Sequence, residues 1–207
     1  YVSDAAERDG LQKEAEGLPS IIVSSATAAN AVMLAGGYFN PLTGYMSKAD
    51  ALSVADNMHT ASGLFWPTPV LNLVEDSGDI KAGDRIALKD PNVDGNPVLA
   101  VMDVEAVEAF SDAEMATMTQ SIYRPAAGEE HIGADTFNAQ GKVCLSGPIQ
   151  VLNYSYFETE FAGTFKTAVE IRQDIANEDF SVCKAQLKQR AIAEGFTSVI
   201  TTDVIDN

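Results

Sequence analysis

The stretch Gly36-Gly37-Tyr38-Phe39-Asn40-Pro41-Leu42-Thr43-Gly44-Tyr45-Met46 is the most informative part of this 207-residue chain. It places three glycines, one proline and three aromatic residues within eleven positions. Glycine reaches backbone angles that are closed to other residues, proline fixes its own φ, and aromatic rings can hold a loop onto a core. From the residues alone we therefore expect a packed turn, with at least one of the three glycines at positive φ.

The same stretch closely resembles the G-G-[FY]-x-P-L-x-G-[FY]-M segment in the N-terminal domain of the ATP sulfurylase (sulfate adenylyltransferase) family. Further blocks of that family follow in family order, and the resemblance runs from about residue 11 to about residue 176. These blocks are Ser47-Lys48-Ala49-Asp50-Ala51, Gly63-Leu64-Phe65-Trp66-Pro67-Thr68-Pro69-Val70, Gly83-Asp84-Arg85-Ile86-Ala87-Leu88, Asp90-Pro91, Gly95-Asn96-Pro97-Val98-Leu99-Ala100-Val101-Met102, His131-Ile132-Gly133 and Ser146-Gly147-Pro148-Ile149.

The resemblance implies a PUA-like β-barrel with flanking helices. Composition by itself supports only an α+β fold, because helical and strand patterns alternate irregularly along the chain. We expect an N-terminal arm over residues 1–17, an ATP-sulfurylase-type PUA-like domain over residues 18–176, and a divergent helix–strand cap over residues 177–207.

Capping residues and apolar periodicity predict helices, and a change of period predicts strands between them. Helices are expected over residues 4–16, 26–34 (capped by Ser25, ended by Gly36), 48–58 (capped by Ser47, with Asp50 in the first turn), 112–123 (opened by a Ser111–Glu114 capping box) and 167–175. Strands are expected over residues 20–24, 68–74, 85–89, 97–109, 142–145 and 149–154, with Gly147-Pro148 breaking the last two apart. In the cap we expect a helix over residues 181–194, stopped by Gly195, and a strand over residues 198–202 that pairs with the body or with another chain.

The charge of the chain disfavours nucleic acids and anionic membranes as partners. Its 30 acidic and 13 basic residues give a net charge of −17, which repels phosphate groups. PUA-like folds elsewhere bind RNA, and this charge opposes that function here. No apolar run approaches the roughly 20 residues of a membrane-spanning helix, and no basic region followed by an apolar stretch opens the chain, so we expect neither a span nor a signal peptide.

The cysteine and histidine content predicts neither a disulfide framework nor a zinc site. The two cysteines, Cys144 and Cys183, are far apart in sequence, and the only histidines are His59 and His131. Zinc sites need four clustered ligands, and secreted frameworks need more cysteines. We therefore expect a reducing, cytoplasmic location.

The segment Asp90-x-Asn92-x-Asp94-Gly95 copies the first six positions of a calcium-binding EF-hand loop. The twelfth position should be a bidentate glutamate, but it is Val101, and the flanking residues have strand character. A hairpin turn between two strands is the favoured interpretation, and a calcium site is the alternative.

The segment His131-Ile132-Gly133-Ala134 is similar to the H-I-G-H motif of nucleotidyltransferases, with Ala134 in place of the second histidine. We expect a structural loop histidine. We expect Trp66 to anchor the core rather than form a recognition surface. The scattered cations Arg85, Lys89, Arg124 and Lys142 are expected to pair with nearby carboxylates, although one of them could hold an anion beside a glycine loop.

In the ATP sulfurylase family, adenylyl transfer from ATP to sulfate uses magnesium and a Q-x-R-N-P-x-H-x-x-H segment of the second domain. The sequence contains no such segment, and Asp203 and Asp206 stand where the family has glutamine and asparagine. We therefore assign no catalytic, cofactor-binding or metal-binding residue and expect no ATP sulfurylase activity from this chain alone.

Two functional hypotheses follow from the resemblance. The first is a stand-alone, non-catalytic binding or assembly module of sulfur metabolism, acting through a protein partner or through self-association. The second is the N-terminal part of an active sulfate adenylyltransferase, whose catalytic domain is truncated here or lies on another chain.

Overall fold

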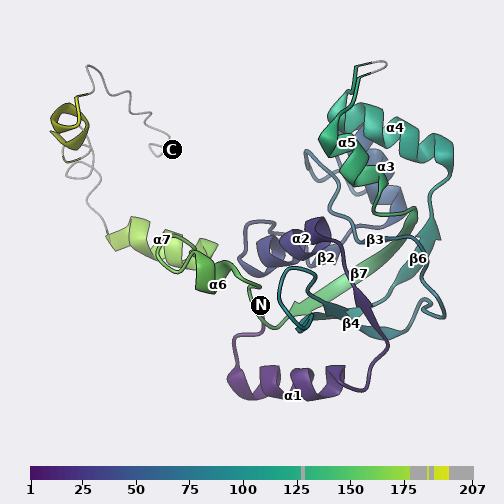
Figure 1. Cartoon of the computed structure of the whole chain (residues 1–207), viewed down its shortest axis with the longest axis horizontal. Helices are drawn as coiled ribbons and strands as arrows, with labels where there is room; N and C mark the ends of the chain where they lie inside the picture. Colours follow the sequence, from purple (N-terminus) through teal and green to yellow (C-terminus); the bar gives the residue numbers. More distant parts are fainter. Residues whose placement is uncertain (127–128, 178–185, 187–188, 196–207) are drawn as a thin grey trace. The chain divides into compact units, whose positions relative to one another are not determined.

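The computed structural model describes residues 1–126, 129–177, 186 and 189–195. They divide into two compact units, Tyr1–Thr167 and Ala168–Asn207. The strands of the first unit are β1 Ser20–Ile22, β2 Gly44–Tyr45, β3 Leu73–Val74, β4 Arg85–Lys89, β5 Val98–Asp103, β6 Ala106–Ala109 and β7 Val143–Val151 (Figure 1). Its helices are α1 Ala5–Ala15, α2 Ser25–Ala35, α3 Lys48–Asn57, α4 Asp112–Tyr123, α5 Ile132–Asn138 and α6 Phe157–Glu160.

The strands form one curled sheet with the order β1-β4-β5-β7-β2, and β3 and β6 also pair with β7. The β1–β4 pair is parallel, and the other pairs are antiparallel. In the part of the chain that the structure describes, no ladder joins β1 to β2, so a closed barrel is not shown. The fold is α+β, as expected, with a curled, open sheet in place of the full barrel.

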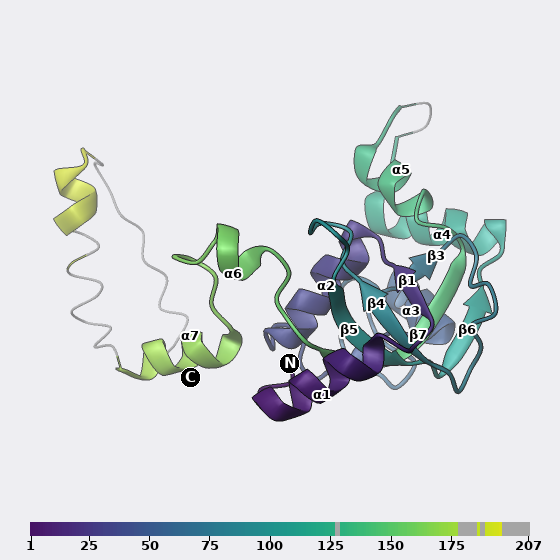
Figure 2. The ribbon, with the colours of Figure 1, turned by 60° about the horizontal axis from the view of Figure 1, so that its bottom comes forward.

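Both faces of the central strands are covered, which explains why β4 and β5 are almost entirely apolar. Successive side chains of a strand point to opposite faces. Ile86 and Leu88 therefore pack in the main core with α2, whereas Ala87 packs with Leu11 and Ala15 of α1. Figure 2 shows α1 on the near side of the sheet.

The expected break at Gly147-Pro148 is wrong, because β7 runs unbroken from Val143 to Val151. The two residues instead mark the place where β7 changes neighbours, from β6 and β3 on one side of it to β5 and β2 on the other. Gly147 has a φ of 141°. Glycine accepts such an angle, so the strand can bend there without ending.

Two other strand expectations needed correction, and two were confirmed. The strand expected over residues 20–24 is β1. The strand expected over residues 85–89 is β4. The strand expected over residues 68–74 is reduced to Leu73–Val74, because Pro67 and Pro69 cannot donate to a ladder. The strand expected over residues 97–109 is divided into β5 and β6, because the sheet bends between them opposite Gly147.

Side-chain caps fix the starts of three helices. Ser24, one residue before the expected Ser25, caps α2 by accepting a hydrogen bond from the Thr27 N–H. Ser47 caps α3, and the Ser111–Glu114 capping box opens α4, as expected. The sequence analysis missed α5, which packs on α4, which in turn packs on α3 (Figure 1).

The N-terminal residues are helical and partly buried: α1 begins at an Asp4 cap, and the Val2 N–H donates to the Val151 carbonyl.

In the second unit, the helix expected over residues 167–175 is α7, Ala168–Asn177. Most of the cap expected over residues 181–202 lies outside the described residues, although Gly195 has the positive φ, 90°, of a helix-ending glycine. The division at residues 17 and 176 stays a prediction. No helix in the described part of the chain combines the length and apolar character that crossing a membrane requires.

Candidate functional site: a hollow at the β2–β7 corner

A hollow of about 410 Å³ opens where the short strand β2 pairs with the bend of β7. One wall is the loop and strand of residues 41–47, and the opposite wall is residues 146–148 of β7. Asp50 of α3, Thr60 and Glu105 complete the lining. Segments about 100 residues apart in sequence therefore build the site together.

The two backbones at this corner approach each other so closely that neither glycine tolerates a side chain. A Cβ added to Gly44 would lie 2.0 Å from the Gly147 carbonyl oxygen, and a Cβ added to Gly147 would lie 2.1 Å from the Asp103 carbonyl oxygen. Glycine is the residue that permits such contacts between backbones. Gly44 is therefore required for steric reasons, whereas the sequence analysis explained the glycines of the 36–46 stretch only by their backbone angles.

The 36–46 stretch is a packed turn, as expected, and Gly37 has the predicted positive φ, 81°. Tyr45 is buried, and its hydroxyl donates to the Thr27 carbonyl over 2.9 Å. Burial raises the pKa of the Tyr45 hydroxyl, because the phenolate would be poorly solvated. Tyr38 differs from the expectation, because 41% of its surface is exposed. Tyr45 rather than Tyr38 therefore anchors the wall of the hollow.

The polar side chains of the hollow are hydrogen-bond acceptors or hydroxyls. The Asp50 carboxylate accepts from the Ala61 N–H over 2.9 Å and from the Ser47 hydroxyl over 3.1 Å. Glu105 is exposed. Ser146 is only 3% exposed and belongs to the lining of the hollow. The lining of the hollow therefore includes two carboxylates, Asp50 and Glu105, and no basic side chain.

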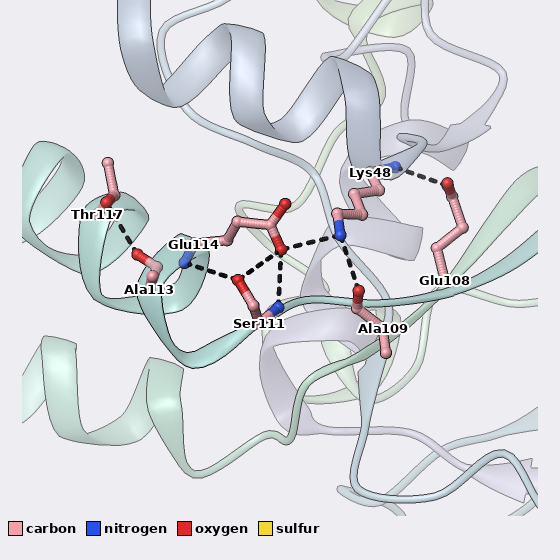
Figure 3. Close-up of polar contacts among 7 residues, drawn as sticks. All are labelled: Lys48, Glu108, Ala109, Ser111, Ala113, Glu114 and Thr117. Carbon is pink, nitrogen blue, oxygen red and sulfur yellow. Dashed lines mark hydrogen bonds and ion pairs between the residues drawn. The ribbon is translucent and has the colours of Figure 1, made fainter.

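Beside the hollow, Lys48 ties α3 to the start of α4 (Figure 3). Its ammonium group lies 2.8 Å from the Glu114 carboxylate, donates to the Ala109 carbonyl, and sits over the Phe110 ring. The Lys48 side chain, together with the Ser111 N–H and hydroxyl, lowers the pKa of Glu114 to about 2. Lys48 is therefore occupied by structural contacts and does not reach the hollow as a free cation.

The Asp90–Asn96 segment is a hairpin turn, as favoured, because it joins the antiparallel strands β4 and β5. The Asp90 carboxylate accepts from the Asn92 N–H over 2.8 Å, and Gly95 and Asn96 both have positive φ. Within residues 1–126, 129–177, 186 and 189–195, no group of three or more His, Cys, Asp or Glu side chains could hold a metal ion.

His131 has a structural function, as expected: it caps α5, and its Nδ1 accepts from the Ala134 N–H over 3.1 Å. Trp66 packs edge-on against Phe39, with ring centroids 5.6 Å apart, and joins the main core, also as expected.

Of the scattered cations, Arg85 and Lys142 pair with carboxylates, in line with the expectation. The buried thiol of Cys144 is not activated, because burial and the nearby Glu108 raise its pKa to about 12.

In a comparison with protein families, the family described as "PUA-like domain" matches residues 1–154. This chain belongs to that family. Among curated proteins, it is 57% identical over 175 residues to a sulfate adenylyltransferase of Allochromatium vinosum and 55% identical over 174 residues to one of Alcanivorax borkumensis. Each match covers 84% of this chain but only 44% and 43% of the relative, respectively. The chain therefore spans less than half the length of these relatives.

A solved structure has the same fold. The chain matches the hexameric APS kinase from Thiobacillus denitrificans with a TM-score of 0.61 and 22% identity, over 84% of this chain and 29% of that one. The sequence analysis had identified the family from the 36–46 stretch and the later blocks, but it missed the hollow. The Ser146-Gly147-Pro148 block, which forms one wall of the hollow, was visible in the sequence. Its pairing with Gly44 could not be predicted from sequence periodicity.

Proposed function

We propose that this chain supplies the non-catalytic, PUA-like binding or assembly part of a sulfate adenylyltransferase system. The observation that carries the proposal is the 57% identity over 175 residues to a sulfate adenylyltransferase of which the match covers 44%. Most of the length of such relatives lies outside the matched region. We place the ATP, magnesium and sulfate sites in that remainder.

The chemistry of the described surface supports this division. Adenylyl transfer to sulfate needs cationic groups that stabilise a crowded, anionic transition state. Of the four candidate cations, Arg85 and Lys142 are engaged by carboxylates of this chain, and so is Lys48 beside the hollow. The hollow is lined by Asp50 and Glu105 and by no basic residue. This environment disfavours phosphate and sulfate, so it suits a partner contact better than the chemical step.

A pyrophosphate-release assay tests the proposal. The purified chain is incubated with ATP, magnesium and sulfate, alone and after mixing with the separately produced remainder of the Allochromatium vinosum relative. We expect no pyrophosphate from the chain alone and a complex with the remainder in size-exclusion chromatography. Turnover by the chain alone would refute a non-catalytic function, and absence of any complex would refute an assembly function.

The same sequence identity supports a second candidate function, in which the chain is the N-terminal part of an active sulfate adenylyltransferase. This candidate predicts that the chain mixed with the remainder of the relative releases pyrophosphate. A non-catalytic assembly module predicts that the complex forms but that pyrophosphate release does not increase. The intact mass of the protein in its native source then distinguishes a chain of 22.0 kDa from a longer polypeptide.

A further inference from the structure

We propose that the apolar face of α7 docks onto the remainder of a sulfate adenylyltransferase, in a groove that is apolar and carries a carboxylate. The inference deepens the proposed function and rests on it for the identity of the partner. The need for a partner, and the chemistry that the partner must offer, follow from the residues of α7.

The second unit buries none of the side chains that the structure describes in it. No residue of α7 is buried, and Val169 and Ile175 are 53% and 40% exposed. The other described residues of this unit, 186 and 189–195, include no buried side chain either, and Ile192 is 59% exposed. The described part of the second unit therefore has no hydrophobic core of its own.

The apolar residues of α7 gather on one side of the helix. Ala168, Ile171 and Ile175 form a stripe, because they are spaced at i, i+3 and i+7. The polar residues of the other side are Glu170, Gln173, Asp174 and Asn177. Helices shorter than about 12–15 residues are marginal in water on their own, and most helical stability in proteins comes from packing of the apolar face. The ten-residue helix α7 therefore needs a surface to pack against.

Arg172 adds a charge requirement to this face. Its neighbours at three and four positions along α7 are all apolar: Ala168, Val169, Ile175 and Ala176. No carboxylate of the helix therefore lies at the spacing that forms an ion pair with Arg172. A partner that covers the stripe would take water from the guanidinium, and a buried cation without a partner is costly. The partner must therefore supply an acceptor, and a carboxylate matches the planar fork of a guanidinium.

The extent of the sequence match favours the remainder of the relative as the partner. The match to the Allochromatium vinosum relative covers 84% of the 207 residues, which is more than the 154 residues of the PUA-like region. The shared sequence therefore extends past residue 154, into the part of the chain that holds α6 and α7. The match covers only 44% of the relative, so more than half of that polypeptide is available to cover α7.

A second copy of this chain fits the face less well. The net charge of −17 makes two copies repel each other. Two copies that pack through the same stripe of α7 would also bring two Arg172 side chains into one interface, and this face of the helix offers no carboxylate to them. Arg172 therefore favours a partner with a different sequence.

Amide hydrogen exchange of the full chain is the first test. In the free chain, the amides of residues 168–177 should exchange rapidly, because no side chain of α7 is buried. Addition of the separately produced remainder of the Allochromatium vinosum relative should slow this exchange by about tenfold or more. Slow exchange of α7 in the free monomer would overturn the proposal, because the chain would then cover the face itself. A dimer of the chain alone that protects α7 would overturn the choice of partner.

Variants of α7 assign the contact to its apolar face. Ile171→Gln and Ile175→Gln should each raise the Kd of the complex by about tenfold or more, measured by titration calorimetry, because each removes an apolar side chain from the contact. Arg172→Met should raise the Kd by about three- to tenfold, and an unchanged Kd would overturn the predicted carboxylate. Gln173→Ala, on the polar side of the same helix, is the matched control and should leave the Kd unchanged. The Tm of each free variant should equal that of the wild type, because these side chains are not buried in the free chain.

The outcomes separate this proposal from the proposed function. Formation of a complex that protects α7 and is weakened by both isoleucine variants supports the proposal. If the complex forms but α7 stays unprotected, or if the isoleucine variants bind as Gln173→Ala does, the docking of α7 is wrong and the assembly function stands. If no complex forms with a remainder that circular dichroism shows to be folded, the assembly function fails, and the partner assigned to α7 fails with it.

Discussion

Replacing Gly44 by alanine should open the β2–β7 corner. The added Cβ would lie 2.0 Å from the Gly147 carbonyl oxygen and 2.6 Å from the Pro148 Cα. Both atoms belong to the backbone, so no side chain can rotate away to make room. Real Cβ contacts almost never fall below 3.0 Å, and the strands must therefore separate by about 1 Å.

The cost of this separation follows from what the corner holds. β2 is only two residues long, so a shift of this size disturbs its whole ladder with β7. It also displaces Tyr45, whose hydroxyl is bonded to the Thr27 carbonyl. Overpacking of a close-packed site costs about 1–3 kcal/mol, and we expect the upper end here because a ladder is lost as well. For a chain of this size, that corresponds to a fall in Tm of about 6–12 °C.

Thermal unfolding followed by the fluorescence of Trp66, the single tryptophan of the chain, measures this effect. Gly10→Ala is the matched control: Gly10 lies inside α1, and a Cβ there would meet nothing within 4 Å. Since alanine is the better helix former, this variant should be more stable than the wild type by about 0.5–1 kcal/mol. A Tm of Gly44→Ala equal to that of the wild type would refute the steric account of the corner.

Three further predictions concern other contacts. Lys48→Met should destabilise the chain at neutral pH. Because the pKa of Glu114 is lowered in the folded state, the Lys48–Glu114 ion pair stabilises the fold above about pH 4.5, and this stabilisation is lost as the pH falls toward 2. The free energies of unfolding in urea of the wild type and the variant should therefore differ at pH 7 and converge at pH 3. A difference in stability that is the same at both pH values would contradict this. Cys144 should resist iodoacetamide at pH 8 in the folded protein and react in urea, as peptide mass mapping can show, because its pKa is raised to about 12; rapid labelling of the native protein would disprove its burial. Arg85→Met should cost about 1 kcal/mol and speed amide exchange in α1, because Arg85 pairs with Glu14 of that helix; unchanged exchange would mean that apolar contacts alone hold α1.

The sequence predicted those parts of the fold that local chemistry determines. The Ser111–Glu114 capping box and the Ser47 cap specify helix starts through hydrogen bonds within four residues, and both are present. The apolar run of β4 and the turn signals that follow it predicted a strand and a hairpin, and both are present. Each of these features can be read from a short window, because its stabilising contacts lie within that window.

The features that sequence reasoning missed depend on contacts between distant segments. Gly147-Pro148 looks like a strand break in the local sequence. In the structure, the backbones of Gly44 and Asp103, from other strands, lie close to Gly147, which is possible because Gly44 and Gly147 have no side chains. The short helix α5 has no strong periodicity, and its His131 cap is an uncommon one. The hollow combines both problems, since its lining comes from residues 41–60, from Glu105 and from residues 146–148.

The charge of the hollow links the fold to the division of labour that we propose. A catalytic site for ATP and sulfate has to concentrate positive charge, whereas the lining of this corner holds two carboxylates, Asp50 and Glu105, and no basic side chain. The acidic lining of this corner therefore supports our proposal that the chain contributes to assembly rather than to the chemical step.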